Sequence, residues 1–175
     1  SIETRLRHAL EQGELSLHYQ PKHELATRRV TGFEALLRWN NADLGFVSPA
    51  DFIPLAEDTG LIIPIGEWVL RQAMRDLRVW NTNRTDKLHV AVNLSARQLT
   101  VDGIAPRIAQ LIAESAIPPG WLELELTESM VMENLHAQID TFHDLRDLGV
   151  RIAIDDFGTG YSSMSYLKRL PIDTL

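Results

Sequence analysis

Two adjacent carboxylates, Asp155 and Asp156, follow the short apolar segment of residues 152–154 and precede a glycine-containing loop. A short apolar run bounded by turn residues is typical of a buried strand, so both carboxylates fall at the carboxyl end of that strand. Neighbouring negative charges repel, and one carboxylate takes up a proton unless a cation lies between them. The pair therefore indicates a divalent metal site, with a structural turn or helix-capping role as the alternative.

Oxygen-bearing side chains also occur on three earlier predicted strands, over residues 28–38, 88–94 and 121–126. They are Glu34, Asn93 and Glu125, with Glu128 just beyond the last strand. Carboxylate and amide oxygens, with no cysteine and no suitably paired histidine, suit Mg²⁺ or Mn²⁺ better than zinc or copper. If the sheet closes into a barrel, the carboxyl ends of its strands converge on one face. We then expect one oxygen-rich site with enough ligands for two ions.

The elements that must position these side chains follow two patterns. The first half of the chain predicts helices over residues 1–13 and 64–80, a helix start at residues 48–51, and strands over 15–19 and 28–38. From residue 88 onward, predicted strands recur about every thirty residues with helices between them, which indicates a parallel sheet. These later elements are helices over residues 104–115, 133–148 and 162–169 and strands over 88–94, 121–126, 150–155 and from 172. The patterns predict an α/β fold whose first two strands are antiparallel.

Composition narrows the function classes. The chain has 175 residues, 45% hydrophobic and 23% charged, as is usual for one globular domain. The absence of cysteine excludes disulfides and thiolate metal sites and fits a reducing compartment. A net charge of −7 argues against DNA or RNA as a partner. No apolar run is long enough to span a bilayer, so we expect no direct membrane contact and a cytoplasmic location, alone or as part of a membrane-anchored protein.

Other chemistries have weaker support. The loop of residues 158–163 lacks the third glycine of a dinucleotide-binding fingerprint, and its Ser162 and Ser163 have no evident histidine partner. His136 and His143 fall on one predicted helix in a pattern that favours a solvated face. A magnesium barrel of the enolase type would need a lysine or histidine base at a strand end, and none of the predicted strands offers one.

Several motifs together resemble one known family. The segment of residues 32–39 contains Glu34-Ala35-Leu36, which resembles the signature of the EAL family, the bacterial phosphodiesterases of cyclic di-GMP. The other matching segments, in order and spacing, are Tyr19–Pro21, Ser48–Glu57, Asn93–Ser95, Glu125–Ser129 and Asp155–Ser163. The resemblance covers essentially the whole chain.

The resemblance implies a fold and an activity. The fold would be a (β/α)8 TIM-like barrel with an antiparallel first strand, of which residues 1–175 are the N-terminal and central part, truncated after about six strands because a full barrel needs about 250 residues. The activity would be hydrolysis of cyclic di-GMP to linear pGpG in second-messenger signalling, with two Mg²⁺ or Mn²⁺ ions as cofactors.

The resemblance also implies roles for individual residues. The metal ligands would be Glu34, Asn93, Glu125, Asp155 and Asp156. Catalysis would depend on Glu34, Asp155 and Asp156, with Asp155 bridging both ions. The ligand contacts would be Gln20, Leu36 and Arg38, with Arg38 suited to a phosphate oxygen. Glu128 would hold the glycine-containing loop.

The family pattern continues beyond Leu175 with a lysine, a glutamate and a glutamine. We therefore expect that the chain continues, and keep a receptor that binds cyclic di-GMP without cleaving it, or a truncated inactive fragment, as alternatives. The resemblance further implies fusion to other signalling domains and allows a homodimer.

Overall fold

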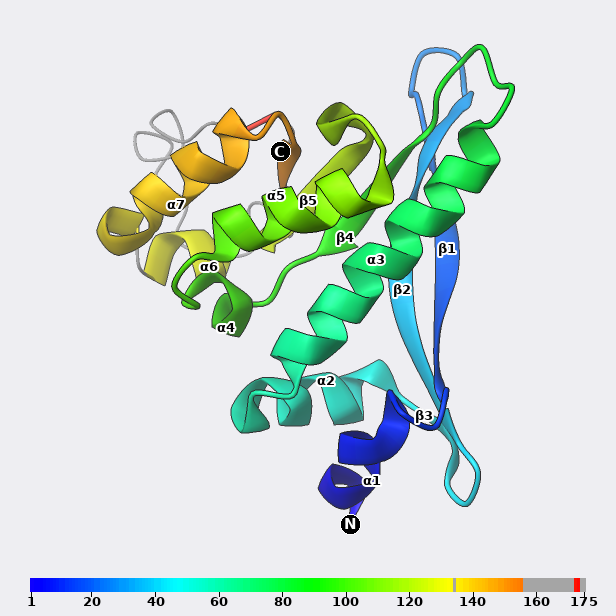
Figure 1. The fold of residues 1–175 in the computed structure, drawn as a ribbon, viewed down its shortest axis with the longest axis vertical. Helices are drawn as coiled ribbons and strands as arrows, with labels where there is room; N and C mark the ends of the chain where they lie inside the picture. The colour runs from blue at the N-terminus through cyan, green and yellow to red at the C-terminus, as the bar shows by residue number, and fades with distance from the viewer. Residues whose placement is uncertain (134, 156–171, 174–175) are drawn as a thin grey trace.

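A computed structural model describes residues 1–133, 135–155 and 172–173 (Figure 1). The elements in chain order are α1 (Ile2–Ala9), β1 (Leu15–His23), β2 (Val30–Asn41), β3 (Gly45–Val47), α2 (Pro49–Thr59), α3 (Ile62–Asn81), β4 (His89–Asn93), α4 (Ala96–Leu99), α5 (Ile104–Ser115), the 3₁₀ turn η1 (Pro119–Trp121), β5 (Leu122–Thr127), α6 (Glu128–Glu133), α7 (Leu135–Asp147) and β6 (Arg151–Asp155). No described helix is both long and apolar enough to cross a bilayer.

The strands form one sheet in the order β1-β2-β4-β5-β6, with β3 paired to β2. The β1 and β3 strands run antiparallel to β2, and the pairs β2–β4, β4–β5 and β5–β6 are parallel. Helices α3 and α5 lie together against one face of this sheet (Figure 1). The α/β prediction with an antiparallel first strand is confirmed.

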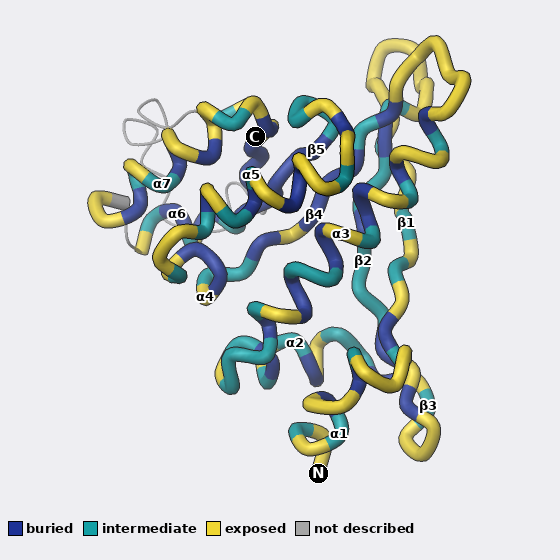
Figure 2. Tube along the Cα trace, viewed as in Figure 1, coloured by how far each residue is buried: buried dark blue, intermediate teal, exposed yellow. Residues whose placement is uncertain are grey.

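Along the parallel strands, successive side chains point to opposite faces of the sheet, so that one face is apolar and the other polar. On β5, Leu122, Leu124 and Leu126 belong to the hydrophobic core. Residues two apart on a strand share a face, so Glu123 and Glu125 point to the opposite side. Both glutamates are nevertheless buried, and the central strands are dark along most of their length in Figure 2. The inner face of the sheet therefore carries buried charge that needs partners.

Strands β2 and β4 approach each other closely at Gly32. A Cβ atom at this position would lie 2.3 Å from the His89 carbonyl oxygen, a distance that no side chain tolerates. Glycine therefore permits the parallel pairing that places Glu34 beside Ala91 two residues further along.

Four local features differ from the sequence prediction. Strand β1 continues through Pro21 to His23, the short strand β3 follows β2 as a hairpin, and α4 was not predicted. Helix α6 begins at Glu128, ahead of the predicted helix start at residue 133, and α7 corresponds to the helix predicted over residues 133–148. Residues 162–169, predicted as a helix, lie outside the described residues. The backbone N–H of Asp173 donates to the Ile152 carbonyl oxygen at 2.8 Å, which places residue 173 beside β6.

Candidate metal centre

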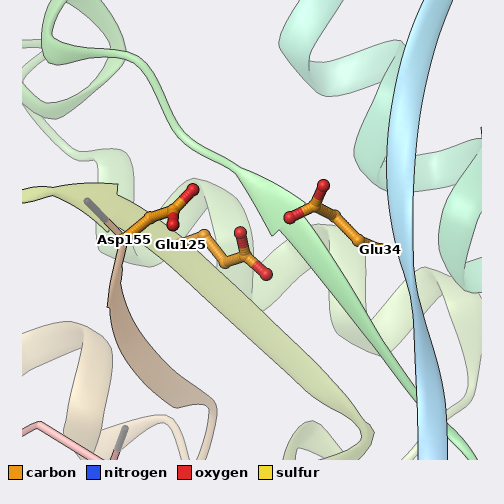
Figure 3. A group of neighbouring side chains, drawn as sticks. All are labelled: Glu34, Glu125 and Asp155. Carbon is orange, nitrogen blue, oxygen red and sulfur yellow. The ribbon is translucent and has the colours of Figure 1, made fainter. Parts of the chain in front are cut away.

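Three carboxylates from three strands meet at the carboxyl ends of the parallel sheet (Figure 3). They belong to Glu34 on β2, Glu125 on β5 and Asp155 at the end of β6, and one carboxylate oxygen from each lies within 4.8 Å of the others. Glu125 is buried, Glu34 is half-buried and Asp155 is exposed. The cluster is therefore shielded from solvent at Glu125 and accessible to solvent at Asp155.

Asn93 lies beside Glu125. The two residues are register partners in the parallel pair of β4 and β5, so their side chains share a face. Both line the cavity described below. Asp156, the fifth ligand implied by the sequence resemblance, lies outside the described residues, as does the glycine-containing loop.

Electrostatics in the cluster favour a cation. Burial, followed by the hydrogen bond and the negative charge of Glu125, raises the pKa of Glu34 to about 7. Glu34 is therefore partly protonated near neutral pH in the metal-free protein. Without a metal ion, a proton on Glu34 limits the repulsion between the carboxylates. A hard divalent cation can replace that proton, and it prefers oxygen donors such as these.

Lys22, on β1, contacts the cluster through Glu125. Its ammonium donates to Glu125 Oε1 at 2.5 Å and to Glu123 Oε1 at 3.0 Å. Burial lowers the pKa of Lys22, but the two carboxylates outweigh that effect, so the pKa is raised and the ammonium stays charged. Sequence reasoning missed Lys22 and Glu123, although each lies two residues from a predicted site residue, Gln20 and Glu125.

A cavity of about 360 Å³ lies beside the cluster and is lined by one of its members, Glu125. Its lining includes Leu36, Arg38, Asn93 and Glu125 from the predicted site. It also includes Glu57 and Ser95, to which the sequence analysis gave no role. The cavity thus joins metal-ligand candidates to an arginine that can bind an anion.

Two further predicted site residues lie near the cluster. Gln20 is the register partner of Glu34 on the antiparallel β1–β2 ladder and is exposed. Glu128 is buried and begins α6, directly after β5. The predicted solvated histidines, His136 and His143, are both exposed on α7.

A parallel sheet that brings acidic side chains together near the carboxyl ends of its strands is typical of α/β-barrel enzymes that hold metal ions there. The profile of the EAL domain family matches residues 3–175, and the chain belongs to this family. The family predicted from the sequence motifs is therefore confirmed, and phosphodiesterases of this family depend on divalent metal ions.

Three comparisons describe the kinship. The chain is 46% identical over 170 residues to the bifunctional diguanylate cyclase/cyclic di-GMP phosphodiesterase MucR of Pseudomonas aeruginosa, covering 97% of this chain and 25% of MucR. It is 43% identical over 174 residues to the cyclic di-GMP phosphodiesterase NbdA of the same organism, covering 99% of this chain and 22% of NbdA. The solved complex of the MucR phosphodiesterase with c-di-GMP superimposes with a TM-score of 0.93 at 45% identity, covering 97% of this chain and 69% of that one. The chain thus spans about a quarter of the length of these curated relatives. Its strands correspond to part of the EAL barrel in the solved structure.

Proposed function

We propose that residues 1–175 form the N-terminal and central part of an EAL domain that hydrolyses cyclic di-GMP to linear pGpG. The observation that carries the proposal is the convergence of Glu34, Glu125 and Asp155 within 4.8 Å beside a cavity lined by Arg38. The kinship to MucR and NbdA, which are cyclic di-GMP phosphodiesterases, supports the choice of substrate.

We further propose Mg²⁺ or Mn²⁺ as the cofactor, with two ions per site. Glu34, Asn93, Glu125 and Asp155 would hold the first ion, and Asp155 and Asp156 would hold the second. A bound ion pair supplies an activated water and stabilises the negative charge that develops on the phosphoryl oxygens. The oxygen-only donor set supports a hard cation in preference to zinc.

The protein's own residues then orient the substrate. Arg38 would donate to a phosphate oxygen, while Gln20 and Leu36 would contact the ligand beside it. A hydroxyl group from water would add to one phosphorus, and one bond from that phosphorus to a ribose oxygen would break. The proton from the same water would complete the ribose hydroxyl that forms. The ring opens to linear pGpG. Glu128 would support the glycine-containing loop from the first turn of α6.

The cellular setting follows from the same proposal. We place the domain in the bacterial cytoplasm, where it would act as one module of a larger signalling protein. The length of the curated relatives, about four times that of this chain, supports a multidomain parent. The net charge of −7 argues against DNA or RNA as the ligand. A homodimer is the proposed assembly.

The test is incubation of the intact protein with cyclic di-GMP and Mg²⁺ or Mn²⁺, with pGpG followed by chromatography. We expect product that disappears when a chelator is added. Asp155→Asn should remove turnover, whereas Asp144→Asn, on the exposed face of α7, should leave it unchanged. Tight binding of cyclic di-GMP without any product would instead identify a receptor and overturn the proposed activity.

A further inference from the structure

The interior of the sheet contains an ion-paired network that the proposed reaction does not use. Glu123 and Glu125, two residues apart on β5, are each 4% exposed. Lys22 lies on β1 and donates to both carboxylates. Two buried carboxylates on one strand face are costly without a cation, so the ammonium has an electrostatic reason to lie between them.

The ion pairs of Lys22 with Glu123 and Glu125 join strands that are not neighbours in the sheet. In the sheet order, β2 and β4 lie between β1 and β5. Neighbouring strands are about 4.8 Å apart, so the side chains meet only because the sheet curls toward its inner face. The register partner of Lys22 on β2 is Gly32, which has no side chain to obstruct the path. The bridge is therefore a feature of the curved sheet.

The two hydrogen bonds have different consequences. The bond to Glu123 Oε1, at 3.0 Å, anchors the ammonium to a carboxylate outside the metal-ligand cluster. The bond to Glu125 Oε1, at 2.5 Å, holds one oxygen of a carboxylate inside that cluster. With Oε1 held by Lys22, the rotation of the Glu125 carboxylate is restricted, and this same carboxylate contributes an oxygen to the cluster with Glu34 and Asp155.

We propose that Lys22, anchored by Glu123, is a positioning residue that orients the Glu125 carboxylate and thereby sets the affinity of the site for a divalent cation. The inference rests on the metal site of the proposed function. Groups that hydrogen-bond to a metal-ligating carboxylate fix its orientation, and their loss typically lowers metal affinity about tenfold to a hundredfold. Lys22 has no direct role in bond breaking.

The experiment measures Mn²⁺ binding to the intact protein without substrate, by electron paramagnetic resonance of the free ion. Lys22→Met should raise the Kd for Mn²⁺ about tenfold or more, and Lys22→Arg, which restores a cationic donor, should recover part of the loss. Glu123→Leu removes only the anchor and should raise the Kd less than Lys22→Met does. Lys87→Met, a lysine whose ammonium donates to the Asn81 carbonyl oxygen, should leave the Kd unchanged.

A second readout separates positioning from simple loss of stability. Saturating Mn²⁺ should restore the turnover of Lys22→Met toward that of the parent protein, because the chemistry itself is intact. A Kd equal to or lower than that of the parent protein would overturn the proposal, and a lower value would mark Lys22 as a competitor of the ion. If Lys22→Met does not fold, Glu123→Leu decides the question by the same criterion. If the parent protein itself binds no Mn²⁺, it is the proposed metal site that fails.

Discussion

The carboxylates of Glu34 and Asp155 lie within 4.8 Å of each other, although strands β4 and β5 separate their own strands in the sheet. Two acidic groups from strands so far apart meet only because the sheet curls toward the barrel axis. Glu125, on the intervening strand β5, is the third carboxylate of this cluster. This geometry leads to four predictions besides the tests given above.

Replacement of Glu34 separates activity from stability. Because the pKa of Glu34 is raised, its ionised form disfavours the folded state above the ordinary glutamate pKa. Glu34→Gln should lower turnover at least about a hundredfold, since it removes a metal ligand. The same variant should melt at a higher temperature than the parent protein in chelator at about pH 8. Glu133→Gln, an exposed glutamate, should change neither property, and a lower melting temperature for Glu34→Gln would contradict the electrostatic account.

Metal affinity should depend on pH through the same group. An ion binds to the carboxylate form, so below about pH 7 it must first displace the Glu34 proton. We expect the Mn²⁺ affinity to rise by up to about tenfold per pH unit toward neutral pH and to level off above it. Titrations across this range measure the slope. A pH-independent affinity in the parent protein would show that Glu34 carries no proton in the metal-free state.

Arg38 should contribute to substrate binding and not to metal binding. A charge-assisted hydrogen bond to a phosphate contributes about 1.5 to 3 kcal/mol, so Arg38→Ala should raise the KM for cyclic di-GMP about tenfold to a hundredfold. The Kd for Mn²⁺ should stay unchanged. The KM of Arg38→Lys should lie between those of the parent protein and Arg38→Ala, because lysine keeps the positive charge but lacks the planar guanidinium group that can donate two hydrogen bonds. An unchanged KM for Arg38→Ala would remove Arg38 from the ligand contacts.

Gly32 should be essential for the close approach of β2 and β4. In Gly32→Ala the added methyl group would meet the His89 carbonyl oxygen at 2.3 Å, so the strands must separate. We expect a loss of about 1 to 3 kcal/mol in the free energy of unfolding. Chemical denaturation measures this loss. Gly120→Ala, where the nearest atom to a Cβ lies at 3.9 Å, is the matched control and should be nearly neutral.

The sequence alone was sufficient to identify the class of fold and the candidate ligands. Its apolar runs are short and alternate with amphipathic helices, which is enough to predict parallel strands. In such a sheet the carboxyl ends of the strands share one edge, so Glu34, Glu125 and Asp155 could be grouped without coordinates. The structure brings these three side chains together.

Local boundaries were harder to predict because tertiary pairing overrides local signals. The strand predicted over residues 15–19 continues through Pro21 to His23 in β1. A proline is tolerated there because β1 lies at the edge of the described sheet, where one row of backbone groups makes no ladder hydrogen bonds. The β3 hairpin and the early start of helical structure at Glu128 likewise lack a strong periodic signal.

Only the tertiary structure revealed the bridge from Lys22 to Glu123 and Glu125. The alternation on β1 and β5 shows which face each side chain occupies, and that much is present in the sequence. Whether a lysine on the first strand can reach a glutamate three strands away depends on the curvature of the sheet. That curvature arises from the packing of the helices and the twist of all the strands together, so the contact of Lys22 with the candidate metal site was decided by the fold as a whole.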